Sequence, residues 1–193
     1  MSAANVLSHN TFGDRGARAA AVAGWSGVPI PPLRISGFPL VPVVEIDNAV
    51  AERRLSTGQG PETDMSTLAV WEDWSADLGP MPPESAVAIV GFISVGTPQR
   101  ALYSLDVLAG YGAGLLLMTG ARRPSEWVMR ECELAGVSLV WSRGDDCECV
   151  VEGRHGPIFT ARRTVATRQK EELLFSHVIR SGLAGSVGCA LRC

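Results

Sequence analysis

The sequence lacks any long apolar run, and this absence excludes a membrane-spanning helix. None of its 193 residues belongs to a stretch that approaches the ~18 consecutive apolar residues of a transmembrane segment. A large excess of positive charge is also lacking, because the formal net charge is −3, so the surface as a whole is not built to attract nucleic acid phosphates. Apolar residues nevertheless make up 46%, which excludes wholesale disorder. We therefore expect a folded chain of one or at most two domains, with neither membrane contact nor direct nucleic acid binding.

Lysine and histidine are scarce, and their scarcity removes several catalytic motifs. Lys170 is the only lysine and lies far from any glycine-rich loop, so no P-loop exists. Three histidines are present, without an H-E-x-x-H motif, and no G-x-S-x-G nucleophile motif occurs. The glycines of Gly110–Gly114 follow a predicted helix and precede a predicted strand, which is the wrong order for a dinucleotide-binding turn. The sequence therefore identifies no catalytic residue and predicts no cofactor.

The five cysteines indicate neither a disulfide framework nor a metal site. Their number is odd, and no N-terminal stretch has the basic-then-apolar layout of a signal peptide, so we expect reduced thiols and a cytoplasmic location. Cys147, Cys149 and His155 offer only three ligands, one fewer than a structural zinc site needs. The pair Cys189 and Cys193 would have to come from far away in the sequence. We therefore predict no bound metal.

Proline separates the chain into two parts. Nine of the 12 prolines lie in residues 1–84, where their clusters disfavour long helices and central strands. We expect this proline-rich N-terminal portion to pack on the core formed by the later residues. Its predicted elements are a helix at Arg15–Ala23, an extended piece at Leu40–Ile46, a short helix at Ala49–Leu55, and a helix at Met65–Leu78 that presents Trp71 and Trp74 to the core.

From residue 85 onward, apolar runs alternate with helical patterns. The runs Ala86–Ser94, Gly114–Thr119 and Val137–Trp141 are continuous rather than alternating, which is typical of parallel strands covered on both faces. Helices are expected at Pro98–Leu108 and from Pro124 to about Ala135. The sequence thus predicts an α/β fold with three layers, a mainly parallel sheet and a β-α-β-α-β core at residues 85–141.

The C-terminal region is expected to continue this α/β core to residue 182. A polar turn at Ser142–Glu148, a short extended piece at Cys149–Glu152 and one long helix at Thr160–Arg180 are predicted, followed by a flexible tail at residues 183–193. Apolar residues gather in the last turns of the long helix, among them Leu174 and Val178. Either a second copy of the chain covers them in a homodimer, or the proline-rich portion folds back over them.

Polar residues at the carboxyl ends of the predicted strands are the best candidates for a site, because ligands of open α/β sheets bind there. Arg122 and Arg123 precede a helix N-terminus, which favours an anion, although the plainer interpretation is that both are solvated arginines that pair with nearby acids. Thr97 could bind a ligand or simply cap its helix. The predicted ligand-binding residues are Ser94, Gly96, Thr97, Thr119, Gly120, Arg122, Arg123 and Ser142.

The order of these features also carries a resemblance to a known family. The segments that carry it are Gly112-Ala113-Gly114-Leu115-Leu116-Leu117, Ala135-Gly136-Val137-Ser138-Leu139-Val140, Gly156-Pro157-Ile158-Phe159, and the helix with Arg168-Gln169-Lys170-Glu171-Glu172-Leu173-Leu174. Over about residues 85–182 the chain resembles the N-terminal ligand-sensing domain of PucR-type (purine catabolism regulator) transcription factors. It departs from them at Ser138, where that family usually has proline, and in having no region for their C-terminal helix-turn-helix.

The resemblance implies a small-molecule-sensing regulatory domain without a DNA-binding region of its own. Its expected partners are a small anionic metabolite and a second copy of the chain that pairs through the C-terminal helix. Two other functions stay open. The chain could be a small α/β enzyme that acts on an anionic metabolite near Ser94, Arg122 and Arg123, or an interaction protein that binds no ligand.

Overall fold

The computed structural model describes residues 14–144 and 146–183. These residues divide into two compact units, each built from two segments of the chain. The first unit combines the described residues of Met1–Val44 with Ile89–Ala161, and the second combines Glu45–Ala88 with the described residues from Arg162 onward. Each unit therefore takes one segment from the proline-rich part of the chain and one from the part that follows residue 85.

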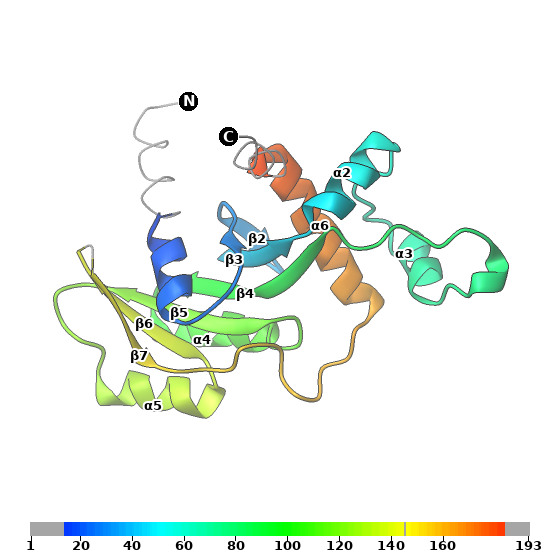
Figure 1. Ribbon diagram of the computed structural model, residues 1–193. Coiled ribbons are helices and arrows are strands. Elements are labelled where there is room, and N and C mark those ends of the chain that lie inside the picture. Colours follow the sequence, from blue (N-terminus) through cyan, green and yellow to red (C-terminus); the bar gives the residue numbers. More distant parts are fainter. Residues whose placement is uncertain (1–13, 145, 184–193) are drawn as a thin grey trace. The chain divides into compact units, whose positions relative to one another are not determined.

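A seven-stranded sheet forms the framework of the first unit (Figure 1). Its strand order is β1-β3-β4-β5-β6-β7, and β2 pairs with β3. Strand β4 pairs in parallel with β5, and β5 in parallel with β6, which confirms the three predicted neighbouring parallel strands. The strands are β1 (Val28–Pro29), β2 (Leu33–Ile35), β3 (Phe38–Ile46), β4 (Val87–Val95), β5 (Ala113–Thr119), β6 (Ser138–Arg143) and β7 (Asp146–Val151).

The prediction of a mainly parallel sheet is wrong. Strands β1 and β2 both pair with β3 in antiparallel fashion, and β6 pairs with β7 in the same way, so the sheet is mixed and mostly antiparallel. The β-α-β-α-β pattern correctly identified the parallel strands, but these are only the middle of a wider sheet. The proline-rich part supplies strands at one end, and a hairpin adds a strand at the other.

Strand β3 shows how this sheet accommodates proline. Pro39 and Pro42 lie within it, although β3 lies inside the strand order between β1 and β4. A proline loses only its N–H group, and its carbonyl can still accept a ladder hydrogen bond. The carbonyl of Pro42 does so from the N–H of Ile30, at 2.9 Å. The extended piece predicted at Leu40–Ile46 is confirmed as part of β3, and its proline does not prevent the strand from having a neighbour on each side.

The polar turn predicted at Ser142–Glu148 is largely strand. Ser142 and Arg143 end β6, and Cys147 and Asp146 of β7 pair with them, while Glu148 pairs with Trp141. Strand β7 lies at the end of the strand order, and its residues are mostly exposed or half-buried. A strand with this little burial tolerates polar side chains, which explains why a polar segment is extended here.

Helices lie on both faces of the parallel strands, as the continuous apolar runs predicted. Ala19 and Ala20 of the helix at residues 14–22 share a core cluster with Ile93 and Leu115. In Figure 1 this blue helix lies on the opposite side of the strands from α4 and α5. Helix α4 (Pro98–Val107) contacts β5, and helix α5 (Glu126–Ala135) contacts β6 and β7. The two helices also contact each other. The side chain of Leu105 approaches Gly114 of β5, so α4 packs closely on the strand there.

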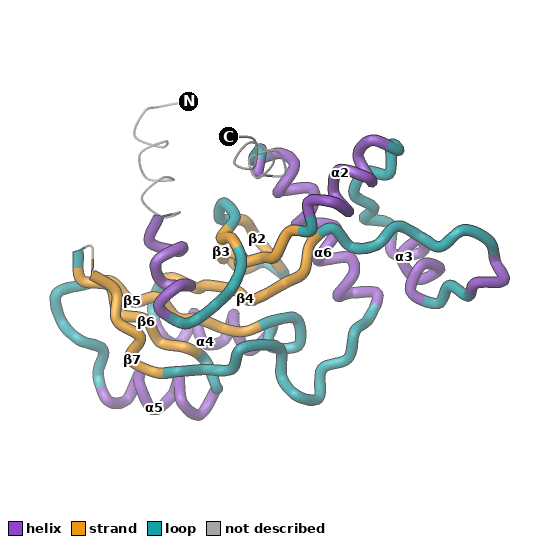
Figure 2. The backbone as a smooth tube through the Cα atoms, viewed as in Figure 1, coloured by secondary structure: helices purple, strands orange, loops and turns teal. Residues whose placement is uncertain are grey.

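The second unit is mainly helical, with loops between its helices (Figure 2). Its helices are α2 (Asn48–Ser56), α3 (Met65–Glu72), the short 3-10 helix η1 (Ala76–Leu78) and α6 (Val165–Arg180). The single helix predicted at Met65–Leu78 is thus two shorter ones. The long helix begins at Val165 rather than Thr160, because the Thr164 side chain caps it and exchanges hydrogen bonds with Thr167.

The apolar residues of α6 are only partly covered within this one chain. Leu174, Phe175 and Val178 are fully buried, and α6 contacts α3. Leu173 and Ile179, which also suggested a homodimer, are half-buried, so the fold-back alternative accounts for the burial of part of the stripe. The homodimer itself stays a prediction. Of the predicted flexible tail at residues 183–193, all but Leu183 lies outside the described residues. In the described part of the chain, no helix combines the length and the apolar character needed to cross a membrane.

Candidate functional site

The carboxyl end of β4 has a backbone that requires glycine. The strand ends at Val95, and Gly96 then adopts a φ of +146°, a conformation that side chains disfavour. No atom lies within 4 Å of the Cβ that a substitution would add there, so conformation rather than packing selects the glycine. Gly120 has the same φ after β5. Both predicted glycines thus lead the chain out of a parallel strand toward the following helix.

A cavity of about 490 Å³ opens beside this turn, within the first unit. Its wall includes Ser94, Gly96 and Thr97, which the sequence predicted, together with Arg34 and Arg100, which it did not. No aspartate or glutamate is among the described residues that line it. Two guanidinium groups without a neighbouring carboxylate make this cavity electropositive, so its charge favours an anionic occupant.

Arg34 reaches the cavity from the hairpin between β2 and β3. Ser36 and Gly37 form the two-residue turn, with φ angles of 50° and 86°, as a tight hairpin of this kind requires. The Nη1 atom of Arg34 donates to the Gly37 carbonyl at 2.9 Å. A guanidinium carries five N–H donors, so this bond orients Arg34 and leaves other donors for a ligand.

Arg100 lies in the first turn of α4. Thr97 is the N-cap but makes no side-chain cap bond, and Pro98 has no N–H. The N–H of Ala101 bonds to the Thr97 carbonyl at 3.0 Å, so the amides of Gln99 and Arg100 precede the regular helical ladder. The Arg100 side chain is exposed and has no hydrogen-bond or ion-pair partner among the described residues. A positive side chain and a helix N-terminus therefore coincide at one end of the cavity.

Ser94 holds β4 against α4 rather than donating into the cavity. Its Oγ lies 3.1 Å from the Oγ of Ser104, and both side chains are buried. The single Ser104 hydroxyl proton is already donated to the Ala101 carbonyl, at 2.7 Å. Because each hydroxyl has one proton, Ser94 must be the donor to Ser104. Ser94 can offer a ligand only acceptor lone pairs, which an anion does not use.

An aromatic pair forms another part of the wall. The rings of Phe38 on β3 and Tyr103 on α4 meet edge to face, with centroids 5.7 Å apart and an interplanar angle of 82°. Such a pair holds its two elements in register and resists rotation of either ring. The cavity is thus bordered by three elements of the first unit, β2–β3, β4 and α4.

The other predicted site residues do not line this cavity. Thr119 and Arg122 are exposed, and Arg123 forms an ion pair with Glu148 at 2.7 Å, with both side chains about half exposed. This ion pair agrees with the alternative interpretation of the loop, in which its arginines pair with nearby acids. Ser142 is buried, and its Oγ is 3.5 Å from the Gly144 carbonyl. Gly120 uses its own carbonyl to accept from the indole Nε1 of Trp141 at 3.0 Å.

The expected position of the second helix start is also wrong. Helix α5 begins at Glu126 after the N-cap Ser125, whereas Pro124 was predicted to start it. Two residues therefore separate Arg123 from the first helical residue. The arginine pair is in the loop rather than at the helix N-terminus, which weakens the electrostatic reason for placing an anion there.

The second unit contains a different group of charged residues, centred on a buried carboxylate. Glu172 of α6 is fully buried and accepts from Arg54 Nη1 at 2.7 Å and from Arg54 Nη2 at 2.8 Å. Arg168, one turn earlier on α6, lies 3.0 Å from the same carboxylate. The N–H of Glu62 adds a further bond at 3.0 Å. The Glu172 carboxylate is thus well compensated, although the buried Nε of Arg168 has no hydrogen-bond partner among the described residues, and we assign this cluster to the stability of the second unit.

The thiols give no indication of metal binding or of nucleophilic catalysis. Cys147 and Cys149 lie on β7, and the described residues contain no group of three or more side chains suited to a metal ion. Burial, together with the neighbouring carboxylates of Glu131 and Glu133, raises the pKa of the Cys132 thiol to about 11. A thiol with so high a pKa is a poor nucleophile near neutral pH. Cys189 and Cys193 lie outside the described residues.

Comparison of the chain with protein-family models, with curated proteins and with solved structures found no match. The site is therefore interpreted from its own geometry.

Proposed function

We propose that the chain is a small-molecule-binding regulatory module whose ligand is a small anionic metabolite held at the carboxyl end of β4. The observation that carries this proposal is the cavity with Arg34 and Arg100 in its wall and no acidic residue among its described lining. Thr97 and the first amides of α4 supply further donors at the same place. Charge-assisted hydrogen bonds of this type are among the strongest that proteins make.

Binding is favoured over catalysis because the only general acid–base side chain in the described lining of the cavity is the Tyr103 hydroxyl. Its described lining contains no histidine, cysteine, aspartate, glutamate or lysine. The two buried serines are bonded to each other and to a backbone carbonyl, so neither hydroxyl is activated by a basic side chain. An anion can be held by this set of groups, whereas a proton cannot readily be taken from a substrate. The enzyme alternative would therefore depend on the Tyr103 hydroxyl for proton transfer at this site.

The regulatory part of the proposal comes from the resemblance to the ligand-sensing domain of PucR-type regulators. This resemblance was drawn from the sequence and does not depend on the geometry of the cavity. The parallel strands β4, β5 and β6 and the helices between them follow the order on which the resemblance was based. The antiparallel strands β1, β2, β3 and β7 lie outside that order and add nothing to it.

The test is a panel of carboxylates and phosphate esters titrated into the full chain by calorimetry, with turnover followed on every compound that binds. We expect at least one anion to bind without being converted. Replacement of the Arg100 side chain (Arg100→Ala) should weaken binding about 10- to 100-fold, because a charge-assisted hydrogen bond contributes roughly 1.5–3 kcal/mol.

Arg130→Ala is the matched control, because Arg130 is an exposed arginine on α5 that does not line the cavity. It removes the same charge and should leave the affinity within about twofold of the wild type, since exposed charges act weakly at a distance. Arg122→Ala tests the site predicted from sequence. If Arg122→Ala abolishes binding and Arg100→Ala does not, the anion binds at the loop after β5 and the proposal is wrong.

A further inference from the structure

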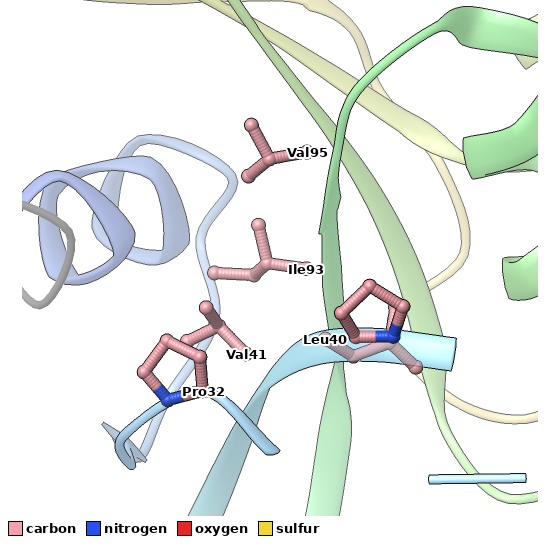
Figure 3. Close-up of a pocket in the computed structure, with 6 residues that line it drawn as sticks. Pro32, Leu40, Val41, Ile93 and Val95 are labelled. Atoms are coloured by element: carbon pink, nitrogen blue, oxygen red, sulfur yellow. The ribbon is translucent and has the colours of Figure 1, made fainter. Parts of the chain in front are cut away.

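A second cavity, of about 290 Å³, lies in the first unit and is lined only by apolar side chains. Its wall consists of Pro32, Pro39, Leu40, Val41, Ile93 and Val95. In Figure 3, Val95, Ile93 and Val41 follow one another along one side of the cavity, and Pro32 lies beside Val41. Among these described residues no side chain can donate or accept a hydrogen bond, so this cavity suits the apolar part of a ligand.

The apolar cavity and the arginine-lined cavity share two residues of their walls, Pro39 and Val95. Val95 is the last residue of β4, and 37% of it is exposed. Ile93 precedes Val95 by two residues and therefore lies on the same face of the strand, whereas Ser94 lies on the opposite face with Ser104. The strand end thus separates an apolar surface from a cationic one, with Val95 bordering both.

We infer that the ligand is an amphipathic carboxylate, with its anionic group at Arg34 and Arg100 and an apolar chain or ring in the cavity lined by Ile93, Val41 and Pro32. This inference rests on the proposed function, because the arginines supply its anchor. A carboxylate is the anion chosen, since its planar shape matches the fork of a guanidinium. A hydrophilic anion would fill only the arginine-lined cavity and leave the apolar one in contact with water.

The experiment titrates butanoate, hexanoate and octanoate into the full chain by calorimetry at a constant salt concentration. Each methylene that enters an apolar environment should raise the affinity about fourfold, so each step of two methylenes should raise it about 16-fold. Hexylammonium has the same chain without the carboxylate and should not bind, because it would bring a second positive charge to the arginines.

Val95→Ser tests the shared wall, and Val107→Ser is its matched control. Both valines are partly exposed, and Val107 is on α4 and lines neither cavity. Val95→Ser should lower the affinity for octanoate at least threefold and that for butanoate less than twofold. Val107→Ser should change neither affinity, and the melting temperatures of both variants should confirm that they fold.

The outcomes separate the inference from the function on which it rests. An affinity that does not rise with chain length, but that Arg100→Ala still weakens about 10- to 100-fold, overturns the amphipathic ligand and leaves anion binding intact. Chain-length dependence that Arg100→Ala leaves unchanged overturns both, since the carboxylate is then not held by the cavity's arginines. If neither the carboxylates nor the phosphate esters of the panel bind, the proposed function itself is overturned.

Discussion

Arginine has opposite roles in the two units of this chain. In the second unit, Arg54 is 1% exposed and is held by the buried carboxylate of Glu172 together with the backbone carbonyls of Gln59, Gly60 and Glu84. In the first unit, Arg100 is exposed beside a cavity and has no partner among the described residues.

The difference shows that partners and burial, rather than residue type, distinguish a structural charge from one that can bind a ligand. A buried ion is stable only if nearby groups compensate for its lost hydration, so Arg54 must keep all its contacts in the folded state. An exposed arginine has no such requirement and remains available. The predictions below test this contrast, from the largest expected effect to the smallest.

Arg54→Ala should destabilise the protein by about 3–5 kcal/mol, because it leaves the Glu172 carboxylate buried with one guanidinium fewer. Arg100→Ala should change the free energy of unfolding by less than about 0.5 kcal/mol, as is usual for exposed side chains. Urea unfolding of the two variants measures both values. Similar losses in the two variants would show that the contrast between the units does not exist.

Arg168 and Glu172 should show energetic coupling. Removing either side chain leaves a buried charge less well compensated, so Arg168→Met combined with Glu172→Gln should cost less than the sum of the two single changes. For residues in direct contact, the expected difference is about 0.5–3 kcal/mol. A double-mutant cycle in urea measures it, and additive single effects would mean that the 3.0 Å pair contributes nothing.

The two threonine N-caps should contribute unequally to stability. As with the arginines, the residue of the second unit should contribute more than the residue of the first. Thr164 caps α6 with a side-chain hydrogen bond, so Thr164→Ala should lower the free energy of unfolding by about 1 kcal/mol. Thr97 makes no such bond at α4, so Thr97→Ala should cost less. Thermal or urea unfolding compares them. A larger loss at Thr97 would indicate that this residue stabilises the fold and is not free to contact a ligand.

His177 should produce the smallest effect, a pH dependence confined to mildly acidic conditions. Burial lowers the pKa of its imidazole below the ordinary value of 6.5, and the nearby Arg180 lowers it further. The unfolded chain therefore takes up this proton at a higher pH than the folded chain, so stability falls as the pH decreases through about 6.5. His177→Asn should flatten the stability profile between about pH 7 and about pH 5. An unchanged profile would show that other groups control it.

The parallel part of the fold could be predicted from the sequence because its strands carry a strong local signal. The continuous apolar runs that became β4, β5 and β6 require cover on both faces, and helical spacing lies between them. The sequence predicted Leu40–Ile46 as an extended piece but did not show that β3 has a neighbouring strand on each side. Its prolines lack the N–H group that a ladder of backbone hydrogen bonds uses. The pairing of the Pro42 carbonyl depends on Ile30, twelve residues away, and no local pattern shows it.

The sequence indicated where the candidate site lies, but only some of the residues that line it. The rule that ligands bind at strand carboxyl ends led to Gly96 and Thr97, and both residues line the cavity. Arg100, three residues after Thr97, could have been found by asking which side chain lies in the first helical turn. Arg34 gives no such signal, because it reaches the site only through the hairpin of β2 and β3. The buried network was missed as well, since the polar stretch around Glu172 is typical of a solvated helix face.

The most direct test of the anion site is the backbone amide spectrum of the full chain, recorded by NMR during titration with hexanoate. Binding at the cavity beside β4 should shift the amide signals of Gly96, Thr97, Gln99 and Arg100 most strongly, and saturably. Shifts centred instead on Gly120 to Arg123, or shifts that never saturate, would contradict the central claim that the arginines of this cavity bind an anionic ligand.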